Sequence, residues 1–97
     1  MARFDYHRAG ETYLLDCQAN TLGHLSTRVV APLLPRNQVP SGLSRLHPVL
    51  TVEGRQLVLA THLLTALPTR ELGMRIGSLA ESQDEIMAAL DMLLTGI

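Results

Sequence analysis

The stretch Ser82-Gln83-Asp84-Glu85-Ile86-Met87-Ala88-Ala89-Leu90-Asp91-Met92-Leu93-Leu94-Thr95-Gly96-Ile97 determines what the rest of the chain must supply. Its main apolar residues recur at helical spacing: Ile86, Leu90, Leu93 and Ile97. This spacing predicts a helix with one broad apolar face. Ser82 and Glu85 are spaced as a capping box, and Gly96 is placed to end the helix. The apolar face therefore needs a sheet or a partner subunit to cover it.

The first half of the chain alternates between apolar and polar residues, as β-strands do. Residues 4–7 and 13–18 alternate on either side of turn-forming residues at 8–11, which predicts an opening hairpin. The β-branched segment at 27–30 continues to Pro32 and predicts a third strand. Because proline has no backbone N–H to donate, we expect this strand at a sheet edge or at a bulge.

A second hairpin is predicted in the middle of the chain. Residues 48–52 and 56–61 are rich in Val and Leu and flank a glycine-containing turn at 53–55, and we expect both strands to be central in the sheet. Residues 61–66 are expected to form a helical turn or a loop, and residues 67–73 a short strand. The predicted fold class is mainly β, with about five antiparallel strands in a small barrel closed by one C-terminal α-helix.

Composition excludes several classes of protein. Ninety-seven residues make a single domain, small enough that dimerisation is an expected way to bury more apolar surface. No apolar run approaches the roughly 20 residues that span a bilayer, and the polar start has no signal-peptide hydrophobic region, so we expect a cytoplasmic protein with no membrane contact. The net charge is -1 and the arginines are scattered, so we expect no direct binding to nucleic acid.

Few residues offer chemistry for catalysis or metal binding. The four histidines are too widely spaced for any known metal motif: His7, His24, His47 and His62. We expect them to be solvated or loop side chains. Cys17 has no partner for a disulfide and lies in an alternating strand, which predicts a small buried apolar side chain. No phosphate loop or nucleophile elbow is present, so we expect no catalytic residue, no metal and no cofactor.

A series of short motifs runs through most of the chain in one register. They are Leu15-Asp16 with Gln18, Arg28-Val29-Val30-Ala31-Pro32-Leu33, Leu46-His47-Pro48-Val49, Thr61, Leu67-Pro68, Gly73, Leu79, Ile86, Ala89 and the closing Gly96-Ile97. No single motif is specific, but their order and spacing together resemble the CcdB-type toxins of plasmid and chromosomal toxin–antitoxin pairs. Residues 1–97 are accordingly identified as one CcdB-like toxin domain.

The resemblance implies a particular structure and activity. Proteins of this family fold as a small SH3-like barrel with a C-terminal helix. They form a homodimer that brings the two chain ends together at the dyad. Family toxins are not enzymes. They insert these ends into the A subunit of DNA gyrase, trap the cleaved-DNA state and block replication, and they serve plasmid maintenance. A cognate antitoxin neutralises them by wrapping a disordered tail around the dimer.

The target-binding residues implied by the resemblance lie at the end of the helix and in one loop: Asp91, Leu94, Thr95, Gly96, Ile97 and Leu22. Family members usually end in Trp-Gly-Ile, and the tryptophan stacks against gyrase. Thr95 stands at that position, Leu94 where an aromatic residue is common and Asp91 where a polar amide is common. Loss of such an anchor costs about a few kcal/mol, so we expect weakened gyrase binding.

We expect the antitoxin to bind two polar segments that each carry an arginine, the turn at 8–11 and the loop at 36–42. The residues concerned are Arg8, Gly10, Glu11, Arg36 and Gly42. Two other functions stay open. One is a non-toxic or retargeted family member that sequesters antitoxin. The other is an endoribonuclease, because a related toxin family cuts messenger RNA with a similar barrel; Arg28, Arg45 and Arg70 would then line the RNA groove.

Overall fold

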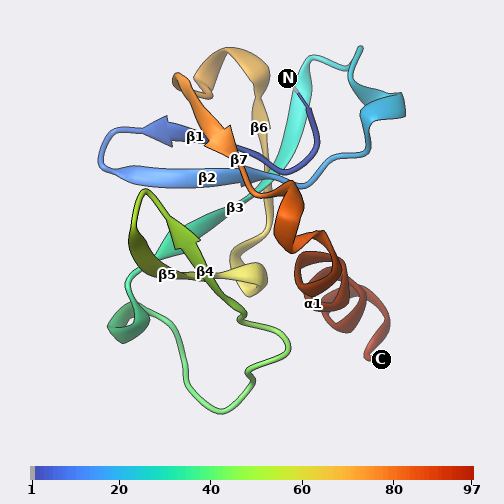
Figure 1. Cartoon of the computed structure of the whole chain (residues 1–97). Helices are drawn as coiled ribbons and strands as arrows, with labels where there is room; N and C mark the ends of the chain where they lie inside the picture. The colour runs from blue at the N-terminus through green and yellow to red at the C-terminus, as the bar shows by residue number, and fades with distance from the viewer. Residues whose placement is uncertain (1) are drawn as a thin grey trace.

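The computed structural model describes residues 2–97, in which a curled antiparallel sheet packs against one C-terminal helix (Figure 1). The strands are β1 (Asp5–Ala9), β2 (Thr12–Asp16), β3 (Thr27–Leu34), β4 (Val49–Val52), β5 (Arg55–Leu59), β6 (Thr65–Pro68) and β7 (Arg75–Ser78). The helix is α1 (Gln83–Thr95), and the 3₁₀ turns are η1 (Asn20–Leu22), η2 (Arg36–Gln38), η3 (Thr61–Leu63), η4 (Thr69–Glu71) and η5 (Ala80–Ser82). This architecture confirms the predicted fold class, although the sheet has seven strands rather than about five.

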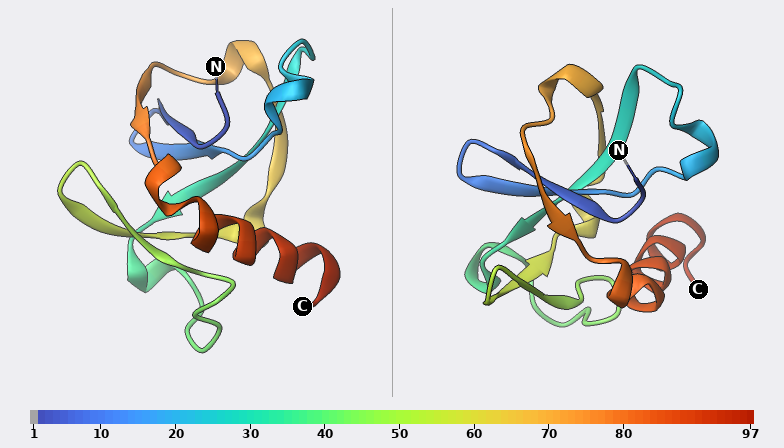
Figure 2. Two further views of the ribbon diagram at one scale, coloured as in Figure 1. Left: turned by 45° about the vertical axis from the view of Figure 1, so that its right-hand side comes forward. Right: turned by 45° about the horizontal axis from the view of Figure 1, so that its top comes forward.

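β3 organises the sheet. The strand order is β4-β5-β3-β2-β1-β7, and β6 also pairs with β3. Residues 27–30 of β3 pair with β6 and residues 33–34 pair with β5, so two strands share one side of β3. The sheet therefore divides along β3 and curls into a half-barrel, with α1 lying beside it (Figure 2).

The proline in β3 is not at an edge of the sheet, so that prediction is wrong. Pro32 lies opposite Leu14 of β2, in the most central strand. Its carbonyl accepts a hydrogen bond of 2.9 Å from the amide of Ala60. The missing N–H falls on that same side, at the point where β3 changes its neighbour from β6 to β5. A central proline is tolerated because the ladder is already interrupted there.

The second hairpin has the predicted turn but not the predicted position. Val52 pairs with Arg55, so Glu53 and Gly54 form a two-residue loop. Their φ angles are 51° and 76°, and two positive values are the signature of a type I′ turn. β5 lies inside the sheet, whereas β4 is an edge strand. The expectation that both strands are central is therefore wrong for β4.

β6 and β7 depart furthest from the sequence prediction. The segment at 61–66 contains η3 and the start of β6, and β7 lies in a segment for which the sequence analysis predicts no strand. Both strands have four residues, too few to show a clear alternation. Gly73, just before β7, marks a close approach that the pattern does not reveal. A Cβ there would lie 1.6 Å from the carbonyl oxygen of Arg8.

The apolar core lies between the curled sheet and the first turns of α1. Its buried residues are Phe4, Tyr6, Leu15, Cys17, Ala31, Leu33, Leu50, Val52, Leu57, Leu59, Leu79, Ile86 and Leu90. Cys17 is buried as predicted, and burial raises the pKa of its thiol to about 12. A thiol with this pKa stays protonated at neutral pH, which agrees with a packing role.

The predicted capping box is absent. The Ser82 side chain makes no capping hydrogen bond, because η5 runs directly into α1. In a capping box the Glu85 carboxylate would accept a hydrogen bond from the Ser82 amide. That amide instead donates to the carbonyl of Leu79 at 2.9 Å. The helix start is therefore satisfied by a 3₁₀ turn of the backbone.

The predicted apolar face is buried only in its first part. Leu90 is 6% exposed, Leu93 is half-buried, and the residues beyond them are exposed. Leu90→Ala is therefore expected to lower the free energy of unfolding by about 2 to 5 kcal/mol. Leu93→Ala, the matched variant on the same face, should lower it by clearly less. Urea unfolding measures both, and equal losses would contradict this boundary of the core.

Candidate functional site

The end of α1 carries most of the predicted target-binding residues. Gly96 has φ 80° and ψ 6°, and its amide donates to the carbonyl of Met92 at 3.0 Å, so it ends the helix as predicted. The hydroxyl of Thr95 donates to the carbonyl of Asp91 at 2.6 Å. The same hydroxyl accepts the amide of Ile97 at 3.4 Å. Thr95 thus directs its polar atom back to its own chain.

Two aliphatic side chains project from this end. Leu94 is 71% exposed and Ile97 is 77% exposed. Asp91, one turn earlier, is exposed as well. In Figure 1 the end of α1 extends away from the sheet. Adjacent exposed apolar side chains are typical of a surface that binds a partner.

Arg45 connects this end to the middle of the chain. Its guanidinium Nη2 donates to the carbonyl oxygen of Ile97. Arg45 lies in the long connection between β3 and β4, 52 residues away in the sequence. The sequence suggests Arg45 only for an RNA groove, because no sequence spacing indicates a contact over such a separation.

Leu22 is not brought to the end of α1. It lies in η1, is 45% exposed, and its carbonyl accepts a hydrogen bond of 2.9 Å from Nε2 of Gln18. In Figures 1 and 2, η1 and the end of α1 are separate projections. Within one chain, the predicted target-binding set is therefore a helix end and a separate loop residue.

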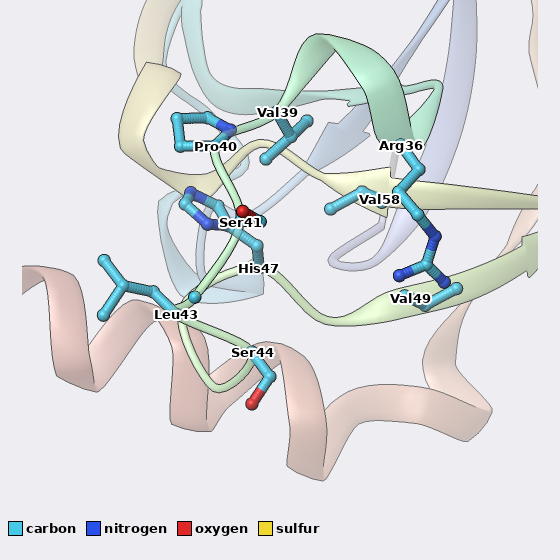
Figure 3. A pocket seen from close by; sticks show the side chains of 10 residues that line it. Arg36, Val39, Pro40, Ser41, Leu43, Ser44, His47, Val49 and Val58 are labelled. Atoms are coloured by element: carbon cyan, nitrogen blue, oxygen red, sulfur yellow. The ribbon is translucent and has the colours of Figure 1, made fainter.

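The residues predicted to contact the antitoxin are all exposed: Arg8, Gly10, Glu11, Arg36 and Gly42. The turn and the loop that carry them adjoin, since Glu11 and Gln38 line one depression of about 260 Å³. Arg36 and Gly42 line a second depression of about 280 Å³ beneath the β3–β4 connection (Figure 3). The two segments therefore form a continuous side of the molecule.

A pair of histidines lies beside this second depression. His47 Nε2 and His62 Nδ1 are 2.8 Å apart, and the two rings meet edge to face with centroids 4.8 Å apart. The expectation of solvated or loop histidines is wrong for His7, which is 2% exposed and lies in β1. His47 lies in a loop as expected but is only 7% exposed. The pair is separated by 15 residues in the sequence, and only the fold brings it together.

The arginines considered for an RNA groove differ in exposure. Arg28 is 1% exposed and donates through Nε and Nη2 to one oxygen of Asp16, at 2.9 Å and 2.6 Å. It is therefore unavailable to a ligand, whereas Arg45 and Arg70 are exposed. Among residues 2–97, no three His, Cys, Asp or Glu side chains are grouped to hold a metal ion. In the same range, no helix is long and apolar enough to cross a membrane.

Solved structures share the overall fold of this chain. One, described as an endoribonuclease in complex with its cognate antitoxin from mycobacterial species, matches with a TM-score of 0.78 and 16% identity, over 97% of this chain and 94% of that chain. The Mycobacterium tuberculosis toxin MazF-mt6 matches with a TM-score of 0.75 and 20% identity, over 92% of this chain and 94% of that chain. No curated protein matches the sequence.

The family of the chain follows from a second comparison. The model of the family described as CcdB protein matches residues 3–96. The chain therefore belongs to the CcdB family, which confirms the resemblance drawn from the motifs. As a member of this family, it is the toxin component of a toxin–antitoxin pair and has a cognate antitoxin as its partner.

The comparisons also correct one prediction. We expected a protein that is not an enzyme, because the resemblance implied a toxin without catalytic activity. A protein with the same fold along nearly its whole length is an endoribonuclease. That expectation is contradicted, because this fold also serves an enzyme.

Proposed function

We propose that this protein is a toxin that binds the A subunit of DNA gyrase through the end of α1. The observation that carries the proposal is the exposure of Leu94 and Ile97 on either side of the Gly96 cap. A Cβ at Gly96 would meet nothing within 4 Å, so a partner backbone has room to approach there. Ile97 then fills an apolar pocket of the partner, as a small exposed anchor does.

This proposal is tested with purified gyrase A subunit. Ile97→Ala should weaken binding by about tenfold or more, because it removes the main apolar contact. Met74→Ala is the matched control, since Met74 is an apolar side chain with 76% exposure, close to the 77% of Ile97, and lies just before β7. Isothermal titration or surface plasmon resonance measures both. Equal binding by the two variants would refute binding through the end of α1.

We further propose that the functional form is a homodimer, because a dyad would place two helix ends side by side. The exposed large apolar side chains support this: Leu22, Leu25, Leu43, Leu63, Met74, Leu94 and Ile97. A second subunit would also allow Leu22 of one chain to approach Ile97 of the other. Sedimentation velocity at tens of micromolar should show a dimer, and Leu94→Glu should shift it toward the monomer. A natively folded wild-type protein that stays strictly monomeric would contradict the proposal.

The antitoxin is proposed to bind as an extended acidic segment along the side formed by the turn at 8–11 and the loop at 36–42. Such a segment orders on binding and covers a large surface, which permits tight but reversible neutralisation. Arg36→Ala should weaken binding of an antitoxin peptide by about threefold to thirtyfold, as loss of a charged contact does. Arg70→Ala is the control on another element. Amide shifts in NMR spectra locate the peptide, and shifts confined to the opposite side would exclude this surface.

Endoribonuclease activity is the second candidate function. It is favoured by the likeness in fold to a structure described as an endoribonuclease. Arg28 is buried against Asp16, so an RNA site here would have to use the exposed arginines. Incubation of total RNA with the purified protein tests this activity directly. Cleavage that is lost in Arg70→Ala but kept in Ile97→Ala would transfer our preference from gyrase to RNA.

A further inference from the structure

One hydrogen bond joins His47 and His62. Their facing nitrogens, Nε2 and Nδ1, are 2.8 Å apart. Nδ1 of His47 is buried and has no hydrogen-bond partner. A buried unpaired N–H costs more free energy than a buried unpaired lone pair, so the hydrogen of His47 belongs on Nε2. His47 therefore donates to His62.

The residues at 43–47 connect this histidine pair to the end of α1, and we call this segment the strap. The His47 amide donates to the carbonyl of Leu43 at 2.9 Å, which closes the strap into one turn. At the end of the strap, His47 is hydrogen-bonded to His62 of η3. In its middle, Arg45 donates a hydrogen bond to the carbonyl of Ile97. Figure 3 shows His47 above Leu43 and Ser44, with α1 beneath them.

The strap does not pack tightly on the helix. Residues of the strap line a cavity of about 450 Å³ together with two residues of α1, Glu85 and Ala88. The strap makes polar side-chain contacts to other elements through Arg45 in its middle and His47 at its end. The histidine bond and the Arg45 contact are therefore the links that hold the strap near the end of α1.

The surroundings of His47 disfavour a positive charge on its ring. Burial lowers the pKa of His47 below its ordinary value of 6.5, and the neighbouring His62 lowers it further. The cavities that His47 lines carry Arg36 and Arg45, with Glu85 on α1 as the acidic group. Because the folded protein holds His47 neutral, protons bind better to a state with His47 in solvent. The bond is therefore stable above the ordinary histidine pKa and is lost as the pH falls below it.

We propose that the His47–His62 bond is a proton-operated latch that holds the strap, and through Arg45 the end of α1, at neutral pH and releases both in acid. A proton added to His47 would place a positive charge in a buried site and put a hydrogen on Nδ1, which has no acceptor there. This inference rests on the proposed function in one respect, because the end of α1 is the proposed gyrase-binding site.

Hydrogen exchange and NMR test the latch without gyrase. Between about pH 6.5 and 5.5, exchange of the His47 amide, corrected for intrinsic chemistry, should rise by about fivefold, as expected when the open state binds one proton with the ordinary histidine pKa. His62→Asn keeps an acceptor oxygen near the position of Nδ1 but cannot titrate. Because it removes only the lesser of the two causes that lower the pKa of His47, this acid response should become smaller. His24→Asn, which removes an exposed histidine from another loop, should leave it unchanged. Arg45→Ala should shift the Ile97 methyl signals toward those of a free chain end at both pH values.

Gyrase binding is then measured separately on the same variants. Wild-type binding should weaken in acid, and binding by His62→Asn should weaken less. An acid response in His62→Asn equal to that of the wild type would overturn the latch, as would unchanged His47 exchange in acid. His7 is the other buried histidine, and its protonation would instead appear in the amides of β1 and β7. If no variant binds gyrase but the exchange results hold, the target assignment fails and the latch stands.

Discussion

Arg28→Met is expected to lower the free energy of unfolding by about 3 to 5 kcal/mol, one of the largest effects of any single substitution in this protein. Arg28 and Asp16 are 1% and 0% exposed and are joined by two hydrogen bonds. Removal of the arginine leaves a buried carboxylate without its counter-charge. The other oxygen of Asp16 accepts only the amide of Gln18, at 3.0 Å, which cannot compensate for that loss.

A double-mutant cycle tests this expectation. Asp16→Asn keeps an oxygen for the Gln18 amide, so the double variant Arg28→Met with Asp16→Asn leaves no unpaired charge. It should be more stable than Arg28→Met alone. Arg55→Met is the control for an exposed arginine and should change the free energy of unfolding by about 0.5 kcal/mol or less. Urea unfolding measures all four variants, and additive losses in the double variant would show that the two charges are not coupled.

Thr95→Trp is expected to strengthen binding to the gyrase A subunit by about two orders of magnitude. The hydroxyl of Thr95 is engaged with the backbone of Asp91 and Ile97, so the side chain offers a partner only a methyl group. A tryptophan ring adds a large flat apolar surface that can stack. Thr95 is exposed, so folding should change little. The wild-type toxin should accordingly inhibit a standard bacterial gyrase weakly or not at all.

Two further variants isolate the cause of any gain. Thr95→Val removes the hydroxyl without adding a ring, so it measures the loss of the local hydrogen bonds alone. A chain without Gly96-Ile97 removes the rest of the proposed contact and should not bind. If wild type, Thr95→Trp and the shortened chain all bind equally, or all fail to bind, gyrase is not the target through this end. The sequestering family member and the endoribonuclease would then be the leading functions.

The residues that carried the family resemblance explain why the fold was easier to predict than the site. Asp16 and Arg28 form the buried ion pair, and Gln18 accepts the amide of Val29 at 3.0 Å, joining the start of β3 to the end of β2. These residues are buried inside the domain, so the resemblance that they carry concerns the fold and not the binding end. Gly96 is the only residue of the proposed binding end for which the sequence also indicated a local conformation, the C-cap.

The sequence by itself determined the mainly β class, both hairpin turns, the helix and its C-cap, because alternation, turn residues and helical spacing are local signals. Only the tertiary structure decided that β3 is central despite Pro32. The missing N–H of a proline is harmful only where a neighbouring strand would accept a hydrogen bond from it, and that depends on how the strands are paired. It also decided that Arg45 meets Ile97 and that His47 meets His62. Such contacts join residues far apart in the chain, and no periodicity encodes a distance that arises only when the sheet curls.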